Sequence, residues 1–487
     1  MTAVLLFLVA CTGPGSTPGG DTSDTDTDSY PTIDEAPPAG TNLLVILADD
    51  MGVDKVAAYG VHDQTPQTPR LDQLIDEGMR FENAYSHPVC SPTRAAMVTG
   101  RYPRRHGIVN IIWNGDRYGL PPDELGVPEI LGESSWFDYS SSLTGKWHLN
   151  AANADWAGVD HPVDFGFEWH AGSNGNPKEV WGDYSDASGL ERGFYNWQKN
   201  TNGSLAMTQV YMTTDTVDDA IARMEAMPEP WLLWVTFNAP HVPLHAPPDE
   251  LYHTPLGPLP DDYALYDAMV EAMDTEMGRL LDNLGDRADR TTVVFLGDNG
   301  TQDHAIRPPL DPGRNKGTLY EGGVRVPFVV SGPLVAYPGS STDALVHAVD
   351  LMPTFAEVAG VDLSQVEGGW MADQPLVYDG RSFLPLLADP DSDDRRDMVY
   401  NEILSKNGGG PDFESNSRSV RDDRYKLIRR DRDGYARDEE FFEFTVENVD
   451  EGPDLLAGGL TVEQQAAYDA LAEELEAVEA TLIYEGI

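Results

Sequence analysis

Residues 42–52 read Asn-Leu-Leu-Val-Ile-Leu-Ala-Asp-Asp-Met-Gly, an apolar run that ends in two acidic residues. Such a run, without polar alternation, is typical of a strand buried on both faces, as in a parallel sheet. Two further apolar runs, at 231–237 and 291–296, also end in polar residues. The polar residues that follow these runs are Asn238 to His241 in one case and Asp298 with Asn299 in the other.

Helical patterns alternate with these strands. Thr68 and Pro69 are expected to cap a short helix with Leu71, Leu74 and Ile75 on one face, and a longer helix is expected over 263–284. A last strand–helix pair is expected around 324–331 and 350–359. This alternation predicts an α/β fold, with a large, mostly parallel sheet flanked by helices. Since ligands bind beyond the carboxyl ends of such strands, the polar residues after the three apolar runs are expected at one sheet edge.

The pattern of alternating strands and helices changes after about residue 390. Residues 424–428 resemble a strand of an antiparallel meander. Thr461 and Gln464 form a capping-box pattern for a last helix, whose apolar positions are Leu471, Leu475, Val478 and Leu482. We therefore predict an α/β domain over 41–390 and a smaller C-terminal subdomain over 391–487, made of an antiparallel sheet and a helix.

The first eleven residues form a short apolar run that ends in Leu8-Val9-Ala10-Cys11. The run is too short to span a bilayer and is typical of a signal peptide. Its end resembles a bacterial lipobox, which implies a lipid on Cys11, although no Lys or Arg precedes the run. Residues 12–40, rich in Gly, Ser, Thr, Asp and Pro, predict a disordered acidic linker. We expect an exported protein, held at the cell envelope, periplasm or outer membrane as a lipoprotein or otherwise secreted, that meets membranes only through this anchor.

The 487 residues carry a formal net charge of −50. Binding to nucleic acid depends on Lys and Arg that neutralise phosphates, so the charge argues against that class of partner. It also repels anionic substrates at long range, so any such substrate needs a local basic pocket. The charge otherwise predicts solubility and says nothing about a reaction.

Cys90 is one of two cysteines, and the other is Cys11 of the leader. It opens the segment Cys-Ser-Pro-Thr-Arg-Ala-Ala-Met-Val-Thr-Gly-Arg, residues 90–101. Pro92 suits the first turn of a helix, and Arg94 lies one turn beyond Cys90 on the same face. A cation and a positive helix end then meet at one place, where an anion such as sulfate could bind. The alternatives are a small buried apolar residue and a thiolate nucleophile with a distant histidine.

This segment resembles the C-x-P-x-R and T-G-R motifs of the formylglycine-dependent sulfatases, an arylsulfatase-like family of the alkaline phosphatase superfamily. Further motifs of the family follow its order and cover about residues 42–430. They are Asp49-Asp50, Gly145-Lys146-Trp147-His148-Leu149, Asn238-Ala239-Pro240-His241-Val242-Pro243, Gly297-Asp298-Asn299-Gly300 and the segment around Lys316.

The resemblance implies that a maturation enzyme oxidises Cys90 to formylglycine, whose hydrate attacks the sulfur of a sulfate ester. It also implies a divalent cation, usually calcium, on Asp49, Asp50, Asp298 and Asn299. Carboxylate and amide oxygens suit Ca²⁺ or Mg²⁺. Taken singly, each of these residue pairs is also common in turns and helix caps.

The resemblance assigns the remaining roles as well. Arg94, Lys146 and Lys316 neutralise the sulfate oxygens, which is electrostatic stabilisation of developing charge. His241 with Lys316 protonates the leaving alcohol, and His148 takes the second hydroxyl's proton so that the aldehyde reforms. Lys146 and His148 project to the same side if their segment is extended. His106 and His245 receive no role, and His106 is expected to pack or to cap a helix.

The expected activity is therefore hydrolysis of aryl or carbohydrate sulfate esters. One alternative is a phosphonate or phosphate monoester hydrolase of the same superfamily. Another is a catalytically dead cell-surface protein that binds sulfated glycans. Residues 150–230, rich in Trp, Asn and Gly, are expected to shape the pocket for the leaving group.

Overall fold

The computed structural model describes residues 40–154, 158–181, 190–366, 376–405, 407, 415–444 and 450–481. The chain divides into Met1–Pro31 and Thr32–Ile487, and everything described below belongs to the second unit. The predicted signal peptide, Cys11, almost all of the linker and Leu482 lie outside the described residues.

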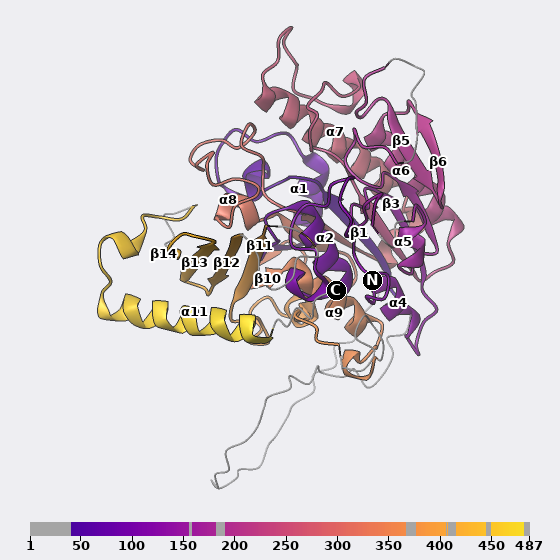
Figure 1. The fold of residues 1–487 in the computed structure, drawn as a ribbon. Coiled ribbons are helices and arrows are strands. Elements are labelled where there is room, and N and C mark those ends of the chain that lie inside the picture. Colours follow the sequence, from indigo (N-terminus) through magenta and orange to yellow (C-terminus); the bar gives the residue numbers. More distant parts are fainter. Residues whose placement is uncertain are drawn as a thin grey trace. The chain divides into compact units, whose positions relative to one another are not determined.

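A ten-stranded sheet forms the centre of the unit, in the order β10-β2-β9-β8-β1-β7-β3-β4-β5-β6 (Figure 1). Its strands are β1 (Asn42–Ala48), β2 (Gly78–Tyr85), β3 (Ser140–Gly145), β4 (Trp169–Gly172), β5 (Trp197–Thr201), β6 (Ser204–Thr208), β7 (Trp231–Thr236), β8 (Thr291–Gly297), β9 (Phe328–Ser331) and β10 (Ser340–His347). The run β8-β1-β7-β3-β4 is parallel, and β10 also pairs with β2 in parallel. Antiparallel neighbours occur where β9 lies between β2 and β8 and at the β4-β5-β6 edge. The predicted mostly parallel sheet is confirmed.

The register of the central strands explains where the polar residues emerge. All seven residues of β1 are buried, as the unbroken apolar run predicts. Leu47 of β1 is paired with Thr236 of β7, and Ala48 is paired with Gly297 of β8. Because the three strands run in the same direction and end at nearly the same level, the residues after them reach one edge of the sheet.

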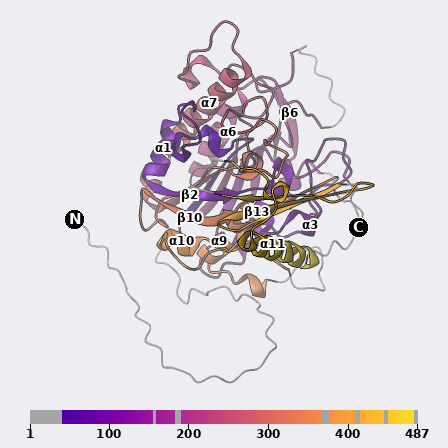
Figure 2. The same ribbon diagram turned by 90° about the vertical axis from the view of Figure 1, so that its left-hand side faces the viewer.

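Helices cover both faces of this sheet (Figure 2). They are α1 (Pro69–Asp76), α2 (Cys90–Thr99), α3 (Pro103–His106), α4 (Val127–Gly132), α5 (His161–Asp164), α6 (Met212–Ala226), α7 (Asp262–Asp282), α8 (Glu321–Val324), α9 (Leu351–Val358) and α10 (Leu384–Ala388). Leu44 and Ile46 of β1 share a core cluster with residues of α1, α6 and α7. On the opposite face, Phe355 of α9 packs edge-on against Trp234 of β7. Short 3-10 turns occupy Val53–Lys55, Ala57–Tyr59, Asp249–Leu251, Gly285–Arg290, Ala348–Asp350, Leu363–Gln365 and Leu455–Ala457.

The predicted start of α1 is right in position but wrong in its cap. The apolar residues of α1 are buried as predicted, but the Thr68 hydroxyl makes no hydrogen bond within the described part of the chain. Instead, the Asp274 carboxylate of α7 accepts the backbone N–H groups of Arg70 and Leu71, at 3.0 and 2.8 Å. A carboxylate from a neighbouring helix thus satisfies the free donors of the first turn.

A second sheet of four antiparallel strands follows, in the order β11-β12-β13-β14. Its strands are β11 (Val399–Leu404), β12 (Ser415–Arg421), β13 (Tyr425–Arg432) and β14 (Asp438–Glu443). The last helix, α11 (Val462–Thr481), lies along this sheet in both views (Figures 1 and 2) and buries Leu471 and Leu475 against it. The capping box is confirmed, since Gln464 N donates to Thr461 Oγ1 and Thr461 N to Gln464 Oε1, at 3.2 and 3.1 Å.

None of the helices among the described residues is long and apolar enough to cross a membrane.

Candidate functional site

The residues that follow β1, β7 and β8 meet at one edge of the sheet, as the sequence predicts. Asp49 N donates to Ala239 O at 3.1 Å, and Asp298 N donates to Ala48 O at 3.0 Å. Asp50 N donates to the side-chain Oδ1 of Asp298 at 2.9 Å. Asp49, Asp50, Asp298 and Asn299 are all fully buried. The backbone therefore places four oxygen-bearing side chains around one point.

Cys90 lies against this group as the first residue of α2. Its sulfur is 3.5 Å from Asp49 Oδ1 and 3.7 Å from Asp50 Oδ1. Burial raises the pKa of the thiol well above its usual range, although Lys146 and Lys316 act in the opposite direction. The sulfur is therefore neutral at pH 7, which disfavours a thiolate nucleophile. Its charged neighbours also make Cys90 unlike an ordinary buried apolar residue.

Asp50 is the most heavily contacted carboxylate of the site. Its Oδ1 accepts hydrogen bonds from Asn299 Nδ2, at 2.8 Å, and from the Lys316 ammonium. Its Oδ2 accepts one from the Gln302 amide and lies 3.8 Å from His241 Nε2. The Asp50 backbone has φ 71°, a left-handed conformation that is uncommon for a residue other than glycine. Such outliers concentrate at functional sites, where the surrounding contacts hold them.

The other two carboxylates bind cationic side chains. Lys146 Nζ donates to Asp49 Oδ2 at 2.6 Å. Arg94 donates Nε and Nη2 to Asp298 Oδ2, at 3.0 and 2.8 Å, and its Nη1 donates to Lys146 O at 3.0 Å. Arg94 therefore lies on the predicted face of α2, but its guanidinium group is already paired with the Asp298 carboxylate.

The ionisation of these groups follows from burial and neighbouring charge. Burial, helped by the charge of Asp49, raises the pKa of Asp298 to about 7. Burial also opposes ionisation of Asp49, but the cations Lys146, Arg94 and Lys316 hold its pKa well below the usual range. Burial lowers the pKa of His241 to about 4. The carboxylate of Asp50 overcomes the burial of Lys316 and raises the pKa of its ammonium group. At pH 7, Lys316 is protonated and His241 is neutral.

Lys146 and His148 leave the end of β3 in an irregular segment, not in a strand. β3 ends at Gly145, and His148 has φ 60°. Trp147 Nε1 donates to His161 Nδ1 at 2.8 Å, whereas Lys146 reaches Asp49 and His148 borders the pocket above Cys90. The expectation of an extended segment is wrong in detail, because His148 adopts a left-handed backbone. Even so, the two side chains serve the same site.

The donor set fits a hard divalent cation. Asn299 Oδ1 is buried and has no hydrogen-bond partner within the described residues. Asp49, Asp50, Cys90 and His241 each bring one possible ligand atom, and these atoms lie within 4.8 Å of one another. Carboxylate and amide oxygens are typical ligands of Ca²⁺ and Mg²⁺. An unpaired buried amide oxygen beside two carboxylates is what such an ion needs.

A pocket of about 660 Å³ opens above Cys90. The predicted residues Cys90, His148, His241 and Lys316 line it, but so do residues that the motifs do not contain. These additional residues are Ile111, Trp113, Asn176, Pro177, Lys178, Glu179 and Gln302, whereas Val242 and Pro243 belong to the motif that contains His241. Only the general expectation that residues 150–230 shape the pocket anticipated Asn176 to Glu179. Gln302, four residues after Asp298, carries no sequence signal of its own.

Two histidines without a predicted role lie outside the pocket lining. His106 ends α3 and accepts Ile108 N through Nδ1 at 3.2 Å, in agreement with the expectation that it packs or caps a helix. His245 contacts Pro243 O and the Tyr211 hydroxyl, at 2.9 and 3.1 Å.

Family profiles and individual relatives both match this chain to sulfatases. The profile of the family described as Sulfatase matches residues 41–361. The profile described as N-sulphoglucosamine sulphohydrolase, C-terminal, matches residues 314–450. The N-acetylgalactosamine-6-sulfatase of Canis lupus familiaris is 30% identical over 383 residues, which cover 70% of this chain and 69% of the relative. Arylsulfatase A of Homo sapiens is 29% identical over 381 residues, 74% of this chain and 70% of that protein.

Solved structures agree with the fold. The structure of Ps i-CgsB is similar with a TM-score of 0.72 at 27% identity and covers 91% of this chain and 94% of that one. Ps i-CgsB has also been solved in complex with k-i-k-neocarrahexaose, and that structure matches with a TM-score of 0.71 at 26% identity, covering the same shares of both chains. The putative sulfatase yidJ from Bacteroides fragilis shares the fold with a TM-score of 0.69 at 18% identity, over 92% of this chain and 98% of that one.

Proposed function

The chain belongs to the sulfatase family, and on that premise we propose that it cleaves aryl or carbohydrate sulfate esters with a formylglycine made from Cys90. The proposal includes a divalent cation, Ca²⁺ or Mg²⁺, held by Asp49, Asp50, Asp298 and Asn299. Water adds across the sulfur–oxygen bond of the ester, so that the alcohol, sulfate and a proton are released.

One arrangement carries this proposal. The Cys90 sulfur lies between two carboxylates, at 3.5 and 3.7 Å, and the Lys316 ammonium, at 3.2 Å, and it borders the pocket. A nucleophile made at this position is next to a cation site on one side and next to a proton donor on the other. Neither an inert buried cysteine nor a simple anion-binding site requires this combination.

The bound groups supply chemistry that the side chains lack. When present, the cation polarises sulfate oxygens, and the hydrated aldehyde provides the hydroxyl that attacks sulfur. Lys146 and Lys316 balance the negative charge of the sulfate group, and Arg94 balances the charge of Asp298.

Proton transfer is divided between Lys316 and the two histidines. Lys316 is protonated at pH 7, whereas burial lowers the pKa of His241 to about 4. We therefore assign the proton for the leaving alcohol to Lys316, with His241 as a neutral hydrogen-bonding neighbour. Burial also holds the pKa of His148 well below its usual range, and its Nδ1 has no partner among the described residues. His148 is therefore available as a base.

The proposal extends to partners and location. We propose a sulfate-ester substrate, a formylglycine-generating maturation enzyme, no nucleic acid, and membrane contact only through a lipid on Cys11 at the cell envelope. We also keep the division into a catalytic domain over 41–390 and a C-terminal subdomain over 391–487.

A direct comparison of substrates tests the reaction class. We expect kcat/KM for 4-nitrophenyl sulfate to exceed the values for the corresponding phosphonate monoester and phosphate. A higher value for the phosphonate would instead favour the alternative hydrolase of the same superfamily. Tight binding of sulfated glycans without any turnover would favour the dead binding protein.

A further inference from the structure

The pocket above Cys90 has a polar floor, with Lys316 as its charged residue, and largely apolar walls. The floor contains Cys90, His148, His241, Gln302 and Lys316, and the apolar wall residues are Ile111, Trp113, Pro177, Val242 and Pro243. If the floor receives the sulfate group, as the proposed function requires, the walls receive the alcohol that leaves. Their chemistry therefore reports on the class of substrate.

Trp113 is the aromatic side chain of this wall. Its side chain is 57% exposed, which is unusual for so large an apolar residue in a folded protein. Its backbone N–H donates to Asp116 Oδ2 at 2.8 Å, and the next residue, Asn114, donates Nδ2 to Val180 O at 2.7 Å. These hydrogen bonds hold the backbone around Trp113, and the residue itself lines the pocket and is exposed to solvent. A held, exposed indole provides a flat apolar surface for another ring.

Glu179 adds a carboxylate to the same pocket. Its Oε1 accepts Asn176 Nδ2 at 3.1 Å, and Asn176 Oδ1 accepts Lys146 Nζ at 2.9 Å. The glutamate is therefore held by a chain of contacts that starts at Lys146, which also binds Asp49. Burial raises the pKa of Glu179, although the Asn176 hydrogen bond and the charge of Lys146 act in the opposite direction. In its ionised form the carboxylate only accepts hydrogen bonds, so it suits a hydroxyl donor and repels a second anion.

The basic group nearest in sequence does not cancel this carboxylate. Lys178 Nζ binds Glu191 Oε1 at 3.0 Å, and both side chains are more than half exposed. Its charge is therefore paired with another carboxylate and screened by solvent. Besides its apolar residues, the wall that the alcohol meets therefore offers Glu179 as a hydrogen-bond acceptor and Lys178 as a cation that is already paired.

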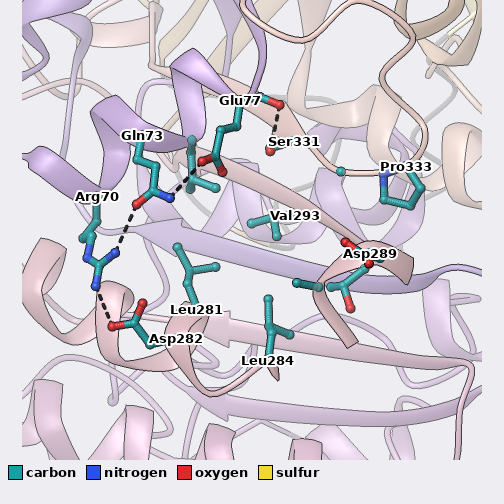
Figure 3. Close-up of a pocket in the computed structure, with 14 residues that line it drawn as sticks. Arg70, Gln73, Glu77, Leu281, Asp282, Leu284, Asp289, Val293, Ser331 and Pro333 are labelled. Carbon is teal, nitrogen blue, oxygen red and sulfur yellow. Dashed lines mark hydrogen bonds and ion pairs between the residues drawn. The ribbon is translucent and has the colours of Figure 1, made fainter. Parts of the chain in front are cut away.

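A second pocket, of about 450 Å³, lies near the start of β8, at the other end of that strand from Asp298 (Figure 3). Four of its polar side chains bind one another: Arg70 binds Gln73 and Asp282, at 3.0 and 2.5 Å, and Gln73 binds Glu77 at 2.9 Å. This pairing leaves the Glu179 pocket as the better candidate for a specific organic group.

We propose that the leaving alcohol is a neutral sugar, whose ring lies against Trp113 and whose hydroxyl donates a hydrogen bond to Glu179. Sugars that carry a carboxylate near the scissile ester are selected against by the same glutamate. This inference rests on the proposed function and adds the substrate class. Glu179 and Trp113 act as specificity-determining residues.

Matched substrates test this directly. Galactose monosulfates and galacturonic acid monosulfates, sulfated at the same hydroxyl, differ only in a hydroxymethyl group or a carboxylate, and 4-nitrophenyl sulfate lacks a hydroxyl donor. We consider the pair of sugars, sulfated at the same hydroxyl, that the formylglycine-bearing wild-type enzyme turns over best. Within this pair, we expect kcat/KM to be at least ~10-fold higher for the galactose sulfate than for the galacturonic acid sulfate. Glu179→Gln should lower kcat/KM for the neutral sugar about 10-fold and raise kcat/KM for the uronic acid. For 4-nitrophenyl sulfate, kcat/KM should change less than about twofold. Trp113→Ala should lower kcat/KM for the sugar mainly through KM.

Glu463→Gln is the matched control, because it makes the same chemical change at a 70% exposed glutamate of α11 that does not line the pocket. It should leave the ratio between the sugar substrates unchanged. A wild-type preference for the uronic acid, or an equal change in all three substrates for Glu179→Gln, would overturn this inference alone. No turnover of any sulfate ester by the modified enzyme would overturn the proposed function and this inference together.

Discussion

The Lys316 ammonium nitrogen lies 3.2 Å from the Cys90 sulfur, although 226 positions separate the two residues in the chain. Backbone hydrogen bonds create this proximity. Lys316 N donates to Thr301 O at 3.0 Å, and Gly317 N donates to Pro88 O at 2.8 Å. The segment that carries Lys316 is thus attached both to the loop after β8 and to the residues just before Cys90.

The first prediction concerns the maturation of Cys90. In active protein, the peptide that contains Cys90 should have exchanged sulfur for oxygen and lost a pair of hydrogens, as expected for formylglycine. A buried thiol whose pKa is raised well above its usual range is a poor nucleophile at pH 7. Peptide mass spectrometry together with kcat measures this, and Cys90→Ala should be inactive. Full activity in protein with an unmodified Cys90 thiol would contradict the mechanism.

The second prediction concerns the metal. Chelation should abolish turnover, and Ca²⁺ or Mg²⁺ should restore it and raise Tm, since an ion that binds only the folded state stabilises it. Asp298→Ala should lose both responses, whereas Asp303→Ala, which removes a 73% exposed carboxylate five residues away, should keep them. Elemental analysis that finds stoichiometric zinc and no alkaline-earth ion would show the ligand assignment to be wrong.

The third prediction distinguishes two roles of Lys316: stabilising negative charge and donating a proton to the leaving alcohol. Lys316→Met should lower kcat for a simple alkyl sulfate by ~100-fold or more, and by much less for 4-nitrophenyl sulfate, whose leaving group needs no proton. Lys316→Arg keeps the charge but donates a proton less readily. It should recover activity toward 4-nitrophenyl sulfate and not toward the alkyl sulfate. Equal losses for both substrates in Lys316→Met would remove Lys316 from the role of acid.

A buried ion cluster connects the segment after Lys316 to the second sheet. Glu321, at the start of α8, binds Lys426 at 2.9 Å and Arg421 at 3.0 Å. Glu451 Oε1 accepts Lys426 Nζ at 2.7 Å and the backbone N–H of Glu321 at 2.8 Å. Burial nevertheless raises the pKa of Glu451 to about 7, above its ordinary value of 4.5.

The fourth prediction follows from this pKa. Between pH 4.5 and 7 the folded protein keeps a proton on Glu451 that the unfolded chain has released, so this group's contribution to stability is lost as pH rises. Glu451→Gln removes this loss. Between pH 4.5 and 7, the change in the free energy of unfolding should therefore be more favourable in the variant than in wild type, by on the order of 2 kcal/mol. Denaturant titrations at several pH values measure the difference from wild type. Glu463→Gln, at a 70% exposed glutamate, should follow wild type, and parallel profiles for wild type and Glu451→Gln would contradict the prediction.

The fifth prediction concerns location. Cys11→Ala should release the protein from membranes without changing the activity of the folded body, because the acidic linker separates Cys11 from β1. Detergent-phase partitioning of wild type and variant decides this. Partitioning of both into the aqueous phase would mean that the protein is secreted without an anchor.

The sequence by itself determined the architecture and the location of the site. Uninterrupted apolar runs are typical of strands that are buried on both faces, so they predict central parallel strands, and parallel strands end at the same edge. This is why Asp49, His241 and Asp298 could be assigned to one site from local patterns alone. The capping box at Thr461 and the meander over 424–428 are local in the same sense and are confirmed.

Only the tertiary structure decided which charged groups meet. The binding of Arg94 to Asp298, the attachment of Lys316 to Asp50 and the chain from Lys146 through Asn176 to Glu179 join residues from separate segments. The cap of α1 by Asp274 is of the same kind. Local propensity acts over a few residues, whereas these contacts depend on how loops and helices pack over hundreds of positions. Burial then sets the pKa values, because the cost of removing a charge from water exists only once the surrounding chain has closed over it.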